Sequence, residues 1–132
     1  MSDPTAEPDP KPTTPFKSRP GLARVWHAAR YSRDGLLAAF RHEAAFRQEL
    51  AVGLPLVMLA WWIAPDRWLA LAMTLSIVAV WLVELLNSAI EALSDAVSVE
   101  AHPLIKRAKD MGSAAVMLSI AAAALVWLVA LW

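Results

Sequence analysis

The segment WLALAMTLSIVAVWLVELLNSAIEAL, residues 68–93, decides the fold. Its first part is almost wholly apolar. As an α-helix rising about 1.5 Å per residue, the whole segment is long enough to cross the hydrocarbon of a membrane and continue beyond it. Polar groups gather towards its end and just beyond it, in VELLNSAIEALSD (residues 83–95). At about 100° per residue, four of them fall within about 60° on one helix face, with Asn87 beside them. These four are Glu84, Ser88, Glu91 and Asp95.

Composition narrows the class of protein. The chain has 132 residues, of which 58% are hydrophobic, and its formal net charge is zero. This indicates one small domain of membrane-protein character. The absence of cysteine excludes disulfides, thiolate metal sites and cysteine nucleophiles. Three histidines without HExxH spacing disfavour a zinc hydrolase, and no GxxxxGK[ST] or GxGxxG motif indicates a P-loop or a protein-kinase fold.

Two further apolar runs flank the first segment. LAVGLPLVMLAWWIA (50–64) is short for a span, and Pro55 can kink it. MGSAAVMLSIAAAALVWLVALW (111–132) is long enough. Tryptophans at the ends of these runs are typical of membrane-interface anchors. We therefore predict an all-α membrane protein with three transmembrane helices, at about 49–64, 68–93 and 111–132.

The N-terminal part divides in two. Residues 1–20 hold six of the nine prolines among Asp, Glu, Thr and Lys, which predicts a disordered tail. No apolar h-region follows, so the tail is not a signal peptide. Residues 22–47 have apolar side chains at spacings of three and four, which predicts an amphipathic helix, or a pair of short ones, on the membrane surface. A soluble packing helix is the alternative. The membrane domain is expected to cover residues 21–132.

Basic residues predict the orientation. The region through Arg47 holds eight of the twelve Lys and Arg residues, and three more lie between the second and third spans. The positive-inside rule then places the N-terminus and the 94–110 loop in the cytoplasm. The polar stripe is then expected at the cytoplasmic end of its span, in a multi-pass membrane protein.

Carboxylates and lysines at such an interface can bind a magnesium-nucleotide, since oxygen ligands suit the metal and ammonium groups suit phosphate. The alternative is a helix end that emerges into water, where Glu91 and Asp95 are ordinary solvated residues. Spacing alone indicates a polar cytoplasmic site for a cation or phosphate.

Three blocks in order carry a resemblance: RYSRDGLLAAFRHEAAFRQE (30–49), VELLNSAIEALSD (83–95) and RAKDMGSAAV (107–116). They resemble the prokaryotic diacylglycerol kinase family from about Arg24 to Trp132. The resemblance implies a homotrimer of three-span subunits in the bacterial inner membrane, with a surface helix and with sites between subunits. It also implies direct in-line transfer of the ATP γ-phosphate to the hydroxyl of diacylglycerol with Mg²⁺, and no nucleic-acid partner. An undecaprenol kinase of the same family and a non-catalytic membrane scaffold are the alternatives.

The resemblance also assigns site residues. Glu84 matches the catalytic base and Asn87 a polar residue that supports it, while Glu43 and Glu91 match carboxylates that bind the metal and nucleotide. Further nucleotide contacts match Arg24, Tyr31, Glu100, Ala101, His102, Lys109 and Asp110. Ala101 departs from the family, in which many members have an aromatic residue there. Lipid contacts match Phe46, Arg47, Gln48, Ser113 and Trp127, although Trp127 could equally be an interface anchor.

Overall fold

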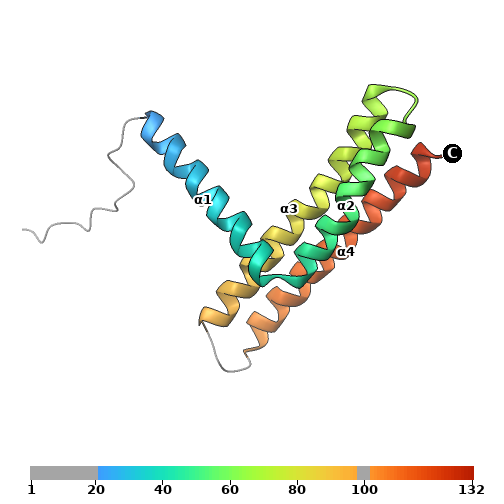
Figure 1. Ribbon diagram of the computed structural model, residues 1–132. Helices are drawn as coiled ribbons and strands as arrows, with labels where there is room; N and C mark the ends of the chain where they lie inside the picture. The colour runs from blue at the N-terminus through green and yellow to red at the C-terminus, as the bar shows by residue number, and fades with distance from the viewer. Residues whose placement is uncertain (1–20, 98–101) are drawn as a thin grey trace, which may run out of the picture. The chain divides into compact units, whose positions relative to one another are not determined.

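The computed structural model describes residues 21–97 and 102–132, and in these ranges every regular element is an α-helix. The helices are α1 (Gly21–His42), α2 (Ala44–Ile63), α3 (Arg67–Val97) and α4 (Pro103–Ala130) (Figure 1). The predicted disordered tail, residues 1–20, lies outside the described residues, as do Glu100 and Ala101. The chain forms two units, Met1–Asp34 and Gly35–Trp132. The all-helical prediction is confirmed for the described part of the chain.

The described part of the first unit is the first half of α1. Its large apolar side chains, among them Leu22, Val25 and Trp26, are exposed. The rings of His27 and Tyr31 lie 6.3 Å apart between centroids, and Arg33 pairs with Asp34 at 3.2 Å. An apolar face left exposed on a helix is consistent with the predicted surface helix. Its placement on a membrane stays a prediction.

In the second unit, the chain leaves α1 at Glu43, which is extended (φ −101°, ψ 113°), before α2 begins. We expected one amphipathic helix over residues 22–47, or a pair of short ones, and the structure has a single helix that ends at His42. No glycine or proline marks this break in the sequence. Arg47 stabilises it, because its Nη1 donates to the backbone oxygens of Phe40 and Arg41, each at 3.2 Å. These carbonyls belong to the last turn of α1, where no helical donor remains for them.

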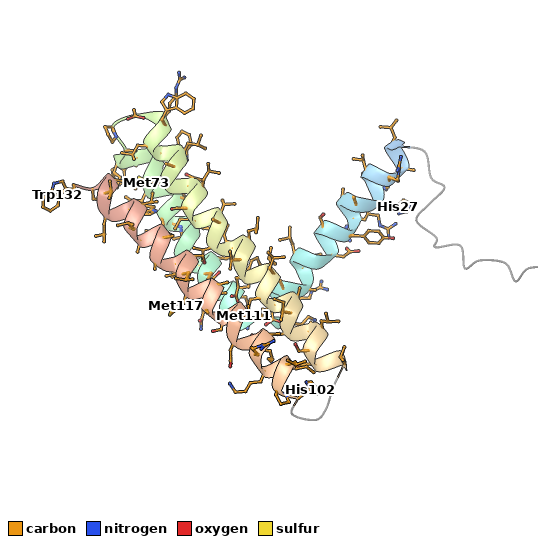
Figure 2. All side chains as sticks on the ribbon, turned by 180° about the vertical axis from the view of Figure 1, so that it is seen from behind. His27, Met73, His102, Met111, Met117 and Trp132 are labelled. Atoms are coloured by element: carbon orange, nitrogen blue, oxygen red, sulfur yellow. The ribbon has the colours of Figure 1, made fainter. Side chains whose placement is uncertain are left out.

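Helices α2, α3 and α4 run alongside one another, and α3 packs against both of the others (Figure 1). The α2–α3 contact includes hydrogen bonds from Trp61 Nε1 to Thr74 Oγ1 (3.1 Å) and from Trp81 Nε1 to the Glu49 backbone oxygen (3.2 Å). Met73 and Trp132 lie towards one end of this bundle and His102 at the other (Figure 2). The apolar core of the bundle is made by Ala60, Ala70, Met73, Ile77, Val80 and Ala123.

Two helices, α3 and α4, are long and apolar enough to cross a membrane, and α2 is not among them. The reason lies in the first turns of α2, which carry Arg47, Gln48 and Glu49. The apolar remainder, residues 50–63, is about 21 Å long at 1.5 Å per residue. The hydrocarbon of a bilayer is about 30 Å thick. The second and third predicted spans thus have matching helices, while the first stays a prediction.

Candidate functional site

The buried face of α3 changes character along the helix. Its first half buries Ala70, Met73, Ile77 and Val80, all apolar. Its second half buries polar side chains, and Glu84 is only 4% exposed. The other buried polar residues of this half are Asn87, Ser88 and Ser94. The polar stripe is therefore not a solvated helix end at Glu84, although that alternative describes the position of Asp95, which is exposed.

Several carboxylates gather around Glu84. Glu43 and Glu91 act electrostatically on Glu84, and Glu84 acts on Glu49. Glu43 precedes the first turn of α2 and its side chain makes no capping hydrogen bond. Like charges held together in a low-dielectric environment repel strongly, so such a cluster is favourable only with a cation or a proton among its members. Such an arrangement does not stabilise the fold, and it favours the binding of a positively charged group.

Asn87 lies between Glu91 of this cluster and Gly112 of α4. Its Nδ2 donates to Glu91 Oε1 at 3.2 Å. Its Oδ1 is buried and has no hydrogen-bond partner among the described residues. A buried amide oxygen without a partner is costly. The unpaired oxygen is thus a second indication that this region is built for something other than stability.

The residues present fit magnesium only as part of a complex with phosphate. Among the described residues, no three His, Asp or Glu side chains are arranged so that they could hold a metal ion on their own. Magnesium bound with nucleotides commonly takes one or two protein carboxylates, with phosphate and water oxygens as the other ligands. Glu43 and Glu91 are half-buried carboxylates near Glu84, which matches this donor set.

Two of the predicted nucleotide contacts, Lys109 and Asp110, each form an ion pair. Lys109 Nζ lies 3.2 Å from Asp95 Oδ1, and Lys106 Nζ lies 2.5 Å from Asp110 Oδ2. Both pairs are partly or largely exposed, and exposed ion pairs are weak. Lys109 can therefore exchange Asp95 for a phosphate at small cost. His102, another predicted nucleotide contact, caps α4, because its Nδ1 accepts a hydrogen bond from the Leu104 backbone N–H at 3.2 Å.

Arg24 and Tyr31 are exposed on α1 in the first unit. Glu100 and Ala101 were placed at the nucleotide by the resemblance, and they lie outside the described residues. These four assignments stay predictions.

An apolar groove of about 460 Å³ opens between α2, α3 and α4. Two of the predicted lipid contacts, Gln48 and Trp127, line it. Trp127 Nε1 and Glu49 Oε2 are buried there and find no hydrogen-bond partner in the described part of the chain. An apolar groove with one unpaired donor and one unpaired acceptor suits a molecule with a hydrocarbon chain and a polar head. The remaining lining residues are Glu49, Val52, Gly53, Leu56, Ile77, Val80, Trp81, Ile120, Ala123 and Ala124.

The other predicted lipid contacts have different surroundings. Phe46 is buried in the fold, with 3% of its surface exposed. The Arg47 guanidinium is bound to the end of α1, and Ser113 is exposed on α4. Only Gln48 and Trp127 of this set are brought together at the groove.

Sequence reasoning missed Glu49. A signal was available, because Glu49 is the one acidic residue in the segment predicted as the first span, 49–64. Ionisable residues in spans commonly mark function. Asp95 was also missed as the partner of Lys109, because an ion pair between two helices depends on where they pack together.

The fold and site define a helical protein of membrane-spanning composition, in which a buried carboxylate, Glu84, lies among half-buried ones near an apolar groove. Residues 30–131 match the family described as prokaryotic diacylglycerol kinase, and the chain belongs to this family. The resemblance inferred from three sequence blocks is thereby confirmed.

Named relatives match over most of their length. A diacylglycerol kinase of Escherichia coli (strain K12) is 46% identical over 112 residues, covering 85% of this chain and 92% of the relative. One from Pseudomonas aeruginosa is 46% identical over 114 residues, covering 86% and 93%. One from Helicobacter pylori (strain 26695) is 42% identical over 111 residues, covering 81% and 84%.

Proposed function

We propose that this protein is a diacylglycerol kinase that transfers the γ-phosphoryl group of ATP to the hydroxyl of diacylglycerol, which gives phosphatidic acid. The observation that carries the proposal is the position of Glu84. It is a buried carboxylate at the point where the buried face of α3 changes from apolar to polar. Relatives from several bacteria that share 36–46% identity with this chain are all named diacylglycerol kinase.

Helix length supports a reaction at the membrane surface. The 31 residues of α3 are about 46 Å long, which exceeds the hydrocarbon thickness of about 30 Å. Some 20 residues counted from Trp68 reach about residue 87. Glu84 then lies near the edge of the hydrocarbon, at the depth of the diacylglycerol hydroxyl. The charge distribution supports an orientation in which this edge is on the cytoplasmic side of the inner membrane, where ATP is available.

In the proposed reaction, Glu84 accepts the proton of the lipid hydroxyl while the hydroxyl oxygen attacks the γ-phosphorus in line. The bond from phosphorus to the bridging oxygen of the β-phosphate breaks, and ADP leaves. Glu84 then gives its proton to solvent. Burial of Glu84 supports this role, because it keeps water from competing with the lipid hydroxyl as acceptor.

Glu43 and Glu91 would hold magnesium together with the nucleotide, and Asn87 orients Glu91 through its 3.2 Å hydrogen bond. When bound, Mg²⁺ supplies positive charge that offsets the charge of the transferring phosphoryl group. Lys109 leaves Asp95 and binds a phosphate oxygen, which is a stronger charge-assisted interaction.

The groove takes the lipid in this proposal. Its apolar walls cover an acyl chain, and the unpaired atoms Trp127 Nε1 and Glu49 Oε2 bind polar atoms of the glycerol head. Glu49 is electrostatically coupled to Glu84, which supports placing the lipid head beside the base.

We further propose that α2 is the third span and that the protein is a homotrimer with sites between subunits. The α2–α3 contacts from Glu49 to Trp61 support a hairpin that crosses the membrane together. Exposed large apolar side chains recur on α3 at spacings of three, four and seven, which favours association between copies of this helix. These are Leu71, Leu75, Val78, Leu82, Leu86 and Leu93.

Topology and assembly have separate tests. A reporter fused after Trp132 is expected outside the cytoplasm and one inserted at residues 96–106 inside it, and the reverse pattern contradicts the orientation. Mixed trimers of Glu84→Gln and Lys109→Ala subunits should regain some activity if the site is shared between subunits. Full activity of detergent-solubilised monomers contradicts a shared site.

The activity itself is tested with purified protein, ATP, Mg²⁺ and either diacylglycerol or undecaprenol in mixed micelles. We expect phosphatidic acid to form. Phosphorylation of undecaprenol alone would establish the other acceptor class, and no product from either lipid would favour a scaffold.

A further inference from the structure

Gly112 lies on α4 where this helix meets the polar half of α3. It is buried, and a Cβ added to it would collide with Asn87 Oδ1. Asn87 Cγ at 3.4 Å and Ile90 Cδ1 at 3.7 Å are the next atoms it would meet. The amide oxygen of Asn87 thus fills the space where any other residue would have its side chain.

The backbone does not require glycine at this position. All four glycines lie in described helices, and none has a positive φ angle. Glycine is also a poorer helix former than alanine, so α4 itself would be favoured by alanine at residue 112. The requirement comes from α3, through the amide of Asn87.

Only one orientation of that amide suits its surroundings. Nδ2 donates to Glu91 Oε1 at 3.2 Å, and the oxygen points to Gly112. The reversed amide would place Oδ1 against the Glu91 carboxylate, where two acceptors repel and no hydrogen bond forms. Space at Gly112 therefore decides whether Asn87 can hold Glu91.

We infer that Gly112 is a positioning residue of the nucleotide site: its missing side chain admits the Asn87 amide, which fixes one oxygen of Glu91 and presents the carboxylate to the magnesium-nucleotide. The inference rests on the proposed function and adds to it a residue that touches neither metal nor substrate. Groups that orient a metal ligand in this way commonly contribute tenfold to a hundredfold to metal affinity.

The test is Gly112→Ala, with magnesium-dependent ATP binding to the full-length protein in micelles measured by calorimetry. The atom nearest the new methyl group is the end of the Asn87 side chain, so we expect the amide to move and the helices to keep their packing. Apparent magnesium affinity should fall by about tenfold to a hundredfold. The KM for diacylglycerol should stay close to that of the unchanged protein.

A double-mutant cycle with Glu91→Gln separates positioning from general damage. The three atoms nearest the Cβ position of Gly112 belong to Asn87 and Ile90, and none of them belongs to Glu91. If Gly112 acts through Asn87 on Glu91, Gly112→Ala should weaken binding by no more than about twofold in the Glu91→Gln background. A loss of equal size in both backgrounds would overturn the inference.

Two other glycines provide matched controls. Gly35 has nothing within 4 Å of its Cβ position, so Gly35→Ala should bind MgATP as the unchanged protein does. At Gly53 the Cβ would lie 2.6 Å from the Trp81 ring and 2.8 Å from Ile77 Cγ2. Gly53→Ala should therefore lower thermal stability, and because Gly53 lines the groove, this variant is a control for loss of stability only.

If Gly112→Ala folds poorly, Gly112→Ala/Asn87→Ala removes the overlap. It should recover the thermal stability of Asn87→Ala and bind MgATP no better than that variant. Failure to recover stability, or unchanged magnesium affinity in folded Gly112→Ala, would show that Gly112 does not act through Asn87. Absence of both ATP binding and lipid phosphorylation in the unchanged protein would instead defeat the proposed function, and this inference with it.

Discussion

The two halves of α3 share one helix and one bundle, yet they bury opposite kinds of side chain. The half that contains Met73, Ile77 and Val80 buries apolar surface, which stabilises the fold. The half that begins at Glu84 buries polar groups, and Asn87 Oδ1 and Ser88 Oγ have no hydrogen-bond partner in the described structure. Such burial costs stability. Folding explains the first half, whereas the second requires a function.

The largest effect is expected for Glu84→Gln. The amide keeps the size of the side chain but cannot accept the proton of the lipid hydroxyl. Turnover should fall by roughly 10²–10⁴-fold, while MgATP binding changes little. Thermal stability should not decrease, because a buried carboxylate is replaced by a neutral group. Lipid phosphorylation and thermal unfolding measure the two quantities, and near-normal turnover would remove Glu84 from the role of base.

Met73→Ala is the counterpart in the apolar half. Met73 is 1% exposed, so the truncated side chain leaves a cavity. The free energy of unfolding should fall by about 2–5 kcal/mol. The KM and kcat of the folded fraction should stay unchanged, because Met73 lies towards the end of the bundle opposite His102 (Figure 2). Loss of kcat without loss of stability would abolish the distinction between the two halves.

Glu91→Gln tests the polar half at a second position. If Glu91 binds the magnesium-nucleotide, the amide should weaken apparent magnesium affinity and lower turnover, because the charges of metal and phosphate are coupled. Raising the magnesium concentration should restore part of the turnover, unlike for Glu84→Gln. Kinetics at several magnesium concentrations separate the two variants. If added magnesium restores no turnover to Glu91→Gln, as expected for Glu84→Gln, Glu91 is not a magnesium ligand.

Much of this comparison was visible in the sequence. The period of the polar stripe placed Glu84, Ser88 and Glu91 on one face of a helix, and the order of three blocks identified the family. Both depend on local spacing, which a sequence displays directly. The orientation, the three spans and the roles of the site residues stay predictions.

What the sequence did not display depends on where helices meet. The break at Glu43 carries no glycine or proline, and it is stabilised by Arg47 from the next helix. Glu49 is adjacent to an apolar run, and only the packing of three helices shows that its carboxylate lines a groove. Among four glycines, nothing local singles out Gly112 as the one whose side-chain space is taken by the amide of Asn87.

The smallest effect is expected at the exposed end of the polar half. As a solvated residue Asp95 would be unimportant, but it pairs with Lys109 at 3.2 Å. Asp95→Asn removes the group with which phosphate competes, and it removes one negative charge near ATP. We expect MgATP to bind about 1.5- to 5-fold more tightly, the equivalent of the 0.2–1 kcal/mol of an exposed ion pair. The gain should shrink as salt screens these charges.

Asp34→Asn, which breaks the exposed pair with Arg33, is the control and should leave MgATP binding unchanged. In a Lys109→Ala background the gain from Asp95→Asn should largely vanish, and an undiminished gain there would indicate a general charge effect. Weaker binding by Asp95→Asn would mean that Asp95 holds Lys109 in place for phosphate rather than competing for it.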